Sequence, residues 1–333
     1  MLFFVATYAA YHKTMKPFII ETHGLSYSFG KRQVLQNLEL RVPQGAIFGF
    51  LGPNGAGKST TIRILLGLLP VPKGQVRVHG HDLHNNRIEI LRRTGSLIEM
   101  PTLYRHLSGH DNLEMHRRMV QAPKSRINEV LQIVGLTQDA YRKTKEYSLG
   151  MSQRLGIALA LLADPELLIL DEPTNGLDPS GIREVRELII RLNREFGKTI
   201  FLSSHLLSEI EKCATELAII DKGATLYQGS LPQLYQGAFQ SSVLQLETSN
   251  DAIARKLLTD HQYELLPQQG DVLAVQVQDR QQVARLNRFL IVNGLEVYRL
   301  STHTHNLEEL FLNITKGEAE PAALQETILA GKV

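Results

Sequence analysis

Short apolar runs separated by turn residues fill the first part of the chain, a pattern that predicts β-strands. Residues 18–29 and 34–42 alternate apolar with polar positions and are expected to be strands. Residues 45–51 (GAIFGFL) are almost wholly apolar, which predicts a buried strand, and residues 60–69 have the spacing of a helix. Later strands are expected at 75–78, 95–99, 167–170, 199–203 and 217–220, and helices at 87–94, 182–194 and 206–213.

The middle of the chain has a different periodicity. Apolar residues recur every three or four positions at 107–119, 124–134 and 153–163, which predicts three helices. Strands that alternate with helices on either side of this stretch predict an α/β fold with a mixed sheet as its core. The helical stretch, about residues 101–163, is then an insert in that fold.

A second, smaller domain is expected after residue 235. A Gln-rich link at 233–242 precedes a stretch whose elements follow the order βαββαβ, which favours a small α+β ferredoxin-like sandwich. The expected domains are therefore 18–235 and 236–316, with a weakly ordered tail at 317–333. The elements are strands at 242–247, 263–266, 272–276 and 296–300, and helices at 251–259, 280–293 and 307–313.

The N-terminal residues 1–17 are expected to be an extension outside the fold. Met1–Tyr11 is apolar, but it is short and lacks the basic start of a signal peptide. Met15 stands just before the first strand, so translation that starts there is the favoured interpretation. A short membrane-surface anchor is the alternative.

Composition excludes several classes of protein. A length of 333 residues suits two domains, and 43% hydrophobic with 21% charged residues is ordinary for a globular protein. The net charge of +2 is too balanced to indicate a nucleic-acid partner, and none is expected. The single cysteine, Cys213, excludes an internal disulfide, and no apolar run reaches the ~18 residues of a membrane span.

The strongest chemical signal is the segment Gly52–Ser59 (GPNGAGKS), which fits the phosphate-binding pattern G-x-x-x-x-G-K-[ST]. It lies between a predicted strand and a predicted helix, as the pattern requires. Glycines let backbone N–H groups turn inward toward phosphate oxygens, and the helix N-terminus adds partial positive charge. Lys58 is placed to reach the β- and γ-phosphates, and Ser59 to bind Mg²⁺.

Two acids and a histidine end neighbouring strands. Asp171 and Glu172 follow a run of four aliphatic residues, where Asp171 suits a Mg²⁺ ligand and Glu172 a general base for the attacking water. The alternative is that the two acids only cap the turn at Pro173. His205 ends the next strand, a position that favours contact with the γ-phosphate.

These motifs, in this order, resemble the ATP-binding subunit of an ATP-binding cassette (ABC) transporter over about residues 18–230. Residues 147–151 (YSLGM) resemble the family's LSGGQ signature, residues 175–178 (NGLD) its D-loop, and Phe29 the aromatic that stacks on adenine. The resemblance implies a P-loop NTPase fold of ABC type, and ATP and Mg²⁺ as cofactors. It implies catalytic roles for Lys58, Glu172 and His205, and Mg²⁺ ligands at Ser59, Glu99 and Asp171. It implies nucleotide contacts at Phe29, Gly52, Pro53, Asn54, Gly55, Ala56, Gly57, Lys58, Ser59, Thr60, Ser148, Gly150 and Asp178.

Two departures from the family pattern stand out. In the signature, Leu149 and Met151 replace a glycine and a glutamine, so altered contacts with the partner's nucleotide are expected. Glu99 stands where the family has the Q-loop glutamine; it is either a stronger Mg²⁺ ligand or a solvated loop residue. These features and residues 306–315 (NLEELFLNIT) are similar to the bacitracin and lantibiotic self-protection exporters.

The resemblance also implies partners and a place in the cell. Two copies sandwich two ATP molecules, and Ser148 and Gly150 of one copy contact the γ-phosphate held by Lys58 of the other. A membrane-spanning permease binds the first part of the insert, at the cytoplasmic face of a bacterial inner (plasma) membrane. The expected function is to power export of a peptide antibiotic or other drug. The alternatives are export of sodium or another small solute, a soluble ABC ATPase, and a non-catalytic ABC subunit. The second domain is expected to pack on its twin in the dimer, to regulate the dimer, or only to stabilise it.

Overall fold

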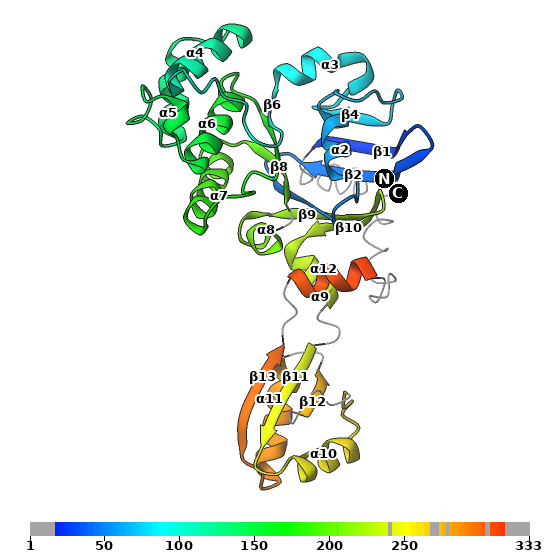
Figure 1. Cartoon of the computed structure of the whole chain (residues 1–333). Helices are drawn as coiled ribbons and strands as arrows, with labels where there is room; N and C mark the ends of the chain where they lie inside the picture. The colour runs from blue at the N-terminus through cyan, green and yellow to red at the C-terminus, as the bar shows by residue number, and fades with distance from the viewer. Residues whose placement is uncertain are drawn as a thin grey trace, which may run out of the picture. The chain divides into compact units, whose positions relative to one another are not determined.

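The structure is a computed structural model that describes residues 17–204, 206–238, 242–266, 273–277, 280–303 and 307–316. The chain divides into two compact units, residues 1–229 and 230–333 (Figure 1). The predicted extension before residue 17, the tail from 317 and His205 lie outside the described residues.

The core of the first unit is a six-stranded sheet with the order β10-β9-β3-β8-β7-β6. Its strands are β3 (Ile47–Leu51), β6 (Thr94–Leu97), β7 (Leu167–Asp171), β8 (Thr199–Ser204), β9 (Glu216–Asp221) and β10 (Ala224–Ser230). The pairs β3–β8, β3–β9, β6–β7 and β7–β8 are parallel. Every residue of β3, β7 and β8 is buried, which explains their apolar runs.

Strand register decides which residues meet at the edge of this sheet. Leu51 pairs with Ser204, and Asp171 pairs with Ser203. The carboxyl ends of β3, β7 and β8 are therefore level, so the segments that follow these strands meet at one edge.

A second sheet, antiparallel, has the order β2-β1-β4-β5. Its strands are β1 (Phe18–Phe29), β2 (Arg32–Pro43), β4 (Val76–Val78) and β5 (His81–Asp82). The two long strands form a hairpin that turns at Gly30, whose φ of 58° favours glycine. This turn places Phe29 at the tip of the hairpin.

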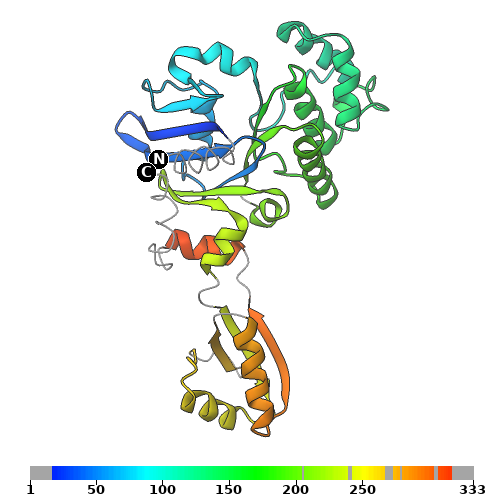
Figure 2. The same ribbon diagram turned by 180° about the vertical axis from the view of Figure 1, so that it is seen from behind.

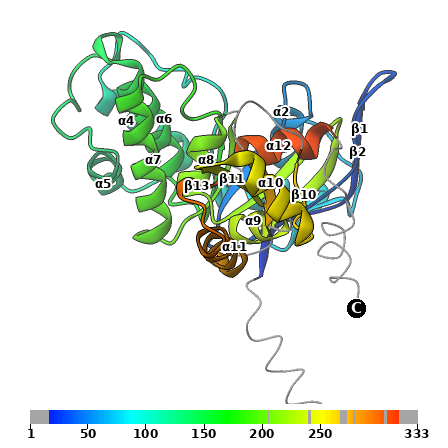
Figure 3. The ribbon, with the colours of Figure 1, turned by 90° about the horizontal axis from the view of Figure 1, so that it is seen from below.

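The helices of the first unit fall into two groups. Helices α2 (Lys58–Leu65), α3 (Leu83–Arg92), α7 (Pro179–Arg194) and α8 (Leu207–Cys213) alternate with the strands. The predicted insert contains α4 (Gly109–Val120), α5 (Ser125–Ile133), the 3₁₀ turn η1 (Thr144–Glu146) and α6 (Leu149–Leu161). Figure 3 shows α4, α5 and α6 gathered with α7 on one side, away from β1 and β2.

The second unit is a three-stranded antiparallel sheet with two helices packed on it. The sheet order is β12-β11-β13, from β11 (Ser242–Thr248), β12 (Leu273–Val277) and β13 (Val297–His303). Alternate residues of β11 and β12 enter a core with α10 (Asp251–Asp260) and α11 (Arg280–Val292). In Figure 2, α11 (orange) lies over one face of the sheet. The unit also contains α9 (Leu231–Ala238) and α12 (Leu307–Lys316).

Several predicted elements are wrong in detail. The helix expected from residue 87 begins at Leu83, because the Asp82 side chain accepts a hydrogen bond from the His84 backbone N–H and caps it. Strand β10 was not predicted; it follows a two-residue turn, Lys222–Gly223, with φ values of 47° and 81°. The strand expected at 263–266 is only an isolated bridge, and the expected link at 233–242 begins as helix α9.

Candidate functional site

The loop after β3 requires its glycines. A side chain at Gly52 would start 2.5 Å from the Ile220 carbonyl oxygen, and one at Gly57 would start 2.6 Å from the Leu35 side chain. Gly55 and Gly57 have φ values of 83° and 110°, in the region that favours glycine. The chain therefore turns tightly from β3 into α2, as a phosphate-binding loop must.

Lys58, the first residue of α2, has its ammonium group over this loop. Its Nζ donates hydrogen bonds to the carbonyl oxygens of Gly52 (2.7 Å) and Pro53 (3.2 Å). Burial lowers the pKa of Lys58, and the charges of Glu172 and Asp171 act in the opposite direction. The lysine is thus a buried cation at the start of a helix, a suitable partner for phosphate.

The two acids after β7 differ in environment. Asp171 is 3% exposed and accepts a hydrogen bond from the Ser203 hydroxyl. Burial raises the pKa of Asp171, the Ser203 hydrogen bond lowers it, and the charges of Glu172 and Glu99 raise it. Glu172 is half-buried, has a φ of 49°, and donates its backbone N–H to the Ser203 hydroxyl (3.0 Å). Ser203 therefore orients both acids.

One cleft of about 670 Å³ brings several predicted residues together. Its wall includes the ring of Phe29, which is 48% exposed and lies edge-on to Tyr27 with 5.1 Å between ring centroids. Predicted site residues that line the cleft are Phe29, Asn54, Gly55, Gly57, Lys58, Ser59, Thr60 and Glu172. An aromatic face, backbone N–H groups, a cation and a carboxylate in one cleft suit a nucleoside triphosphate.

The donor set near Lys58 fits Mg²⁺. No three His, Cys, Asp or Glu side chains form a metal-binding group within the described ranges. A site there would combine the buried carboxylate of Asp171, the Ser59 hydroxyl and phosphate oxygens. In nucleotide-binding proteins, Mg²⁺ is usually bound by one or two protein ligands together with phosphate oxygens of the substrate.

Glu99 lies apart from this cleft. Its carboxylate forms an ion pair with Arg63 of α2, with 3.3 Å between Nη2 and Oε1, and its side chain is 70% exposed. Glu99 has a φ of 58°, an uncommon backbone conformation for a residue other than glycine. Arg63 is four residues after Ser59 and hence on the same face of α2.

Ser148, Gly150 and Asp178 do not line the cleft of their own chain. Ser148 caps α6 by accepting the backbone N–H of Met151 (3.1 Å), and Asp178 caps α7 by accepting that of Gly181 (3.0 Å). The structure therefore places the three predicted contacts at the N-terminal ends of two helices. Such ends attract anions.

Sequence reasoning missed four residues of the site. Arg32, Val34 and Asn175 line the cleft, and Ser203 holds the acids. Ser203 was within reach of prediction, because β7 and β8 are parallel neighbours and Ser203 pairs with Asp171. The other three residues line the cleft because the β1–β2 hairpin and the loop after Glu172 form part of its wall. The periodicity of the sequence does not predict this tertiary arrangement.

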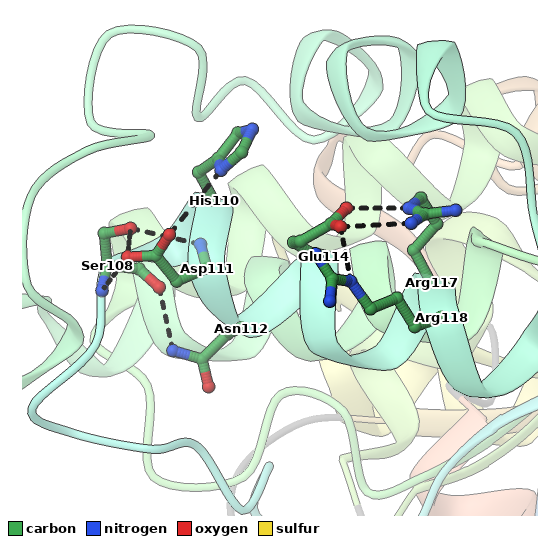
Figure 4. Close-up of polar contacts among 7 residues, drawn as sticks. All are labelled: Ser108, His110, Asp111, Asn112, Glu114, Arg117 and Arg118. Carbon is green, nitrogen blue, oxygen red and sulfur yellow. Dashed lines mark hydrogen bonds and ion pairs between the residues drawn. The ribbon is translucent and has the colours of Figure 1, made fainter.

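A second, larger cleft of about 1210 Å³ is lined by residues from α3, β6, the segment after Glu99, and α4 to α6. Met100 and Met119 on its wall are 60% and 66% exposed. Nearby, α4 begins in a capping box of Ser108 and Asp111, and Asn112 donates to the Ser108 carbonyl oxygen (Figure 4).

Arg117 and Arg118 on α4 both form ion pairs with one carboxylate, that of Glu114. Glu114 accepts hydrogen bonds from both arginines at 2.7 Å, and these bonds lower the pKa of Glu114 to about 2 (Figure 4). The three side chains therefore form an ion-pair network on one helix.

Known proteins are similar in sequence to this chain. Residues 35–175 match the family described as ABC transporter. The bacitracin transport ATP-binding protein BcrA of Bacillus licheniformis is 41% identical over 302 residues, which cover 90% of this chain and 98% of BcrA. This chain belongs to the ABC transporter family. The predicted family and fold are confirmed, and the chain is an ATPase of ABC type.

Other ABC proteins are also similar to this chain. The lantibiotic transport ATP-binding protein SrtF of Streptococcus pyogenes is 44% identical over 64% of this chain and 93% of its own length. A solved ABC transporter ATP-binding subunit is 27% identical, with a TM-score of 0.59 over 66% of this chain and 92% of its own. No helix in the described parts of the chain is long and apolar enough to cross a membrane.

Proposed function

We propose that this ABC protein binds and hydrolyses ATP with Mg²⁺ to power a bacterial membrane exporter of a peptide antibiotic or another drug. The observation that carries the proposal is the single cleft that contains Phe29, Lys58 and Glu172. The substrate class is supported by BcrA and SrtF, which are bacitracin and lantibiotic transport ATP-binding proteins.

Each residue of the cleft has a role in this proposal. Phe29 stacks on the adenine, and Lys58 with the loop N–H groups binds the phosphates. Ser59 and Asp171 hold Mg²⁺, which spreads the phosphate charge when bound. Glu172 accepts a proton from the attacking water. His205, the residue after Ser204 in the sequence, is proposed to contact the γ-phosphate.

Two copies of the chain complete two sites. Ser148, Gly150 and Asp178 do not line their own cleft, which supports a role for them at the cleft of a second copy. Ser148 and Gly150 would bring the start of α6 to the γ-phosphate held by Lys58 of that copy. The proposed assembly is therefore a homodimer closed by ATP.

The second cleft is the proposed docking surface for a membrane-spanning permease at the cytoplasmic face of the membrane. Its exposed methionines, Met100 and Met119, adapt well to an apolar partner helix. Glu99 directly precedes Met100 in the sequence. Glu99, as a Mg²⁺ ligand after ATP binds, would link the permease contact to the nucleotide.

Purification of the tagged chain from native membranes tests this proposal. We expect a multi-span permease to co-purify, and the reconstituted pair to export bacitracin or a lantibiotic with ATP. The same pair with Glu172→Gln is the control and should not transport. Transport of sodium or a small solute instead would favour the alternative exporter, and ATP hydrolysis without any co-purified permease would favour a soluble ABC ATPase.

A further inference from the structure

Helices α6 and α7 begin side by side. A side chain built at Gly150 would start 3.9 Å from the Cα of Gly181, so the first turns of the two helices approach closely. Ser148 and Asp178 cap these helices at the same end. The signature turn and the start of α7 are therefore neighbours within one chain.

Arg154 fixes this arrangement one helical turn further on. Its Nη1 donates to the carbonyl oxygens of Val134 (3.2 Å) and Gly135 (3.4 Å) at the end of α5. Its Nη2 lies 3.5 Å from the carboxylate of Glu184 on α7. The guanidinium joins α5, α6 and α7, so the beginning of α6 cannot move freely relative to α7.

The Leu149 side chain lies at the same end. Its Cδ2 lies 3.4 Å from the point where a Cβ atom at position 176 would stand, so it is close to Gly176, which has no side chain itself. Gly176 belongs to the loop 173–178 between Glu172 and α7. The half-buried Leu149 side chain therefore lies beside the loop that follows the two acids of its own chain.

The backbone of Glu172 needs such support. A residue other than glycine with a φ of 49° is uncommon and is held there by its surroundings. The Ser203 hydroxyl holds the Glu172 N–H on one side (3.0 Å), and a turn from the Asn175 N–H to the Glu172 carbonyl oxygen (3.0 Å) holds the other. That turn is part of the loop beside which Leu149 lies.

We infer that Leu149 is a positioning residue that holds the loop 173–178, and through it Glu172, against the signature turn. A glycine at this place, as in the LSGGQ pattern, has no side chain to make the contact. Leu149 thus joins the turn that Ser148 begins to the loop behind the proposed base of the same chain. The inference rests on the proposed role of Glu172, and it revises the expectation that Leu149 alters contacts with the partner's nucleotide.

The full-length chain with Leu149→Ala tests this inference in two ways. Hydrogen exchange of the backbone amides of residues 174–178 should rise at least about fivefold without nucleotide, since a local contact is lost. With Mg²⁺–ATP, kcat should fall roughly tenfold (~1.4 kcal/mol), while the KM for ATP stays within about twofold. KM is spared because Phe29, Lys58 and the phosphate loop are unchanged.

Matched variants separate positioning from general damage. Leu149→Met keeps an apolar side chain of similar reach and should restore both readouts. Leu257→Ala, the same truncation at a half-buried position on α10, should change neither. Unchanged exchange at 174–178, or a raised KM with normal kcat, would overturn the inference. Wild-type protein without turnover above Glu172→Gln would overturn the proposed function, and the exchange measurement would still decide whether Leu149 holds the loop.

Discussion

The Ser203 hydroxyl donates a hydrogen bond to the Asp171 carboxylate, from the strand next to that of Asp171. This bond opposes the effect of burial, which raises the pKa of Asp171. A neutral hydroxyl thereby helps to keep a buried acid ionised, the form that binds a metal ion.

Ser203→Ala should shift the acid limb of ATP hydrolysis to higher pH. The Ser203 bond lowers the pKa of Asp171, so its loss raises that pKa further, and Asp171 becomes protonated at a higher pH than in the wild type. The measurement is the pH dependence of kcat/KM for both proteins with Mg²⁺ in excess. An acid limb at the same pH in both would show that Asp171 does not control it.

Phe29→Ala should weaken ATP binding. Loss of a stacked aromatic costs about 1–3 kcal/mol, which corresponds to a Kd roughly 5 to 150 times higher. Phe29→Tyr keeps a ring and serves as the control. Equilibrium titration with a fluorescent ATP analogue measures both variants, and equal Kd values for wild type and Phe29→Ala would remove Phe29 from the site.

Glu99→Gln should leave ATP binding within about twofold and change turnover or coupling to transport, because an amide is a weaker Mg²⁺ ligand than a carboxylate. Stability should change by less than ~1 kcal/mol, since the ion pair with Arg63 is exposed. Arg63→Gln breaks the same ion pair and keeps the carboxylate, so it separates the two effects. If Glu99→Gln matches the wild type in both turnover and transport, Glu99 does not act at the metal.

Thr144→Val should destabilise the first unit by about 1 kcal/mol, the net value of one hydrogen bond. Thr144 is 4% exposed, and its hydroxyl donates to the Tyr104 carbonyl oxygen (3.1 Å). Asn112→Ala should cost more, because the Asn112 amide bonds both the N–H and the carbonyl oxygen of Tyr104. Thr144→Ser is the control, and urea unfolding followed by circular dichroism should rank the three. A Thr144→Val midpoint equal to the wild type would contradict this account.

The sequence was sufficient for the features that depend on local pattern. The buried strand β3, the glycine loop and Lys58 lie within a dozen consecutive residues, so spacing alone predicted them. The meeting of Asp171 with that loop followed from the rule that parallel strands end at one edge. A sequence motif can predict these parts of the site.

The remaining contacts depend on tertiary packing. The ion pair of Arg63 with Glu99 joins residues 36 positions apart, and the approach of Leu149 to Gly176 brings the start of α6 to the loop before α7. Strand β10 was missed because its two-residue turn has Lys222 at the first position, where φ is above zero and Asn, Asp or Gly is usual. In each case the deciding interaction is with a residue distant in sequence or with an unusual backbone angle.

The most direct test compares ATP turnover by the purified chain and by Glu172→Gln, with Mg²⁺ present. We expect the wild type to hydrolyse ATP and the variant to be at least ~100 times slower, the usual contribution of a general base. Both should bind ATP equally well, since Lys58 and the phosphate loop are intact. A wild-type rate no higher than that of Glu172→Gln would contradict the account.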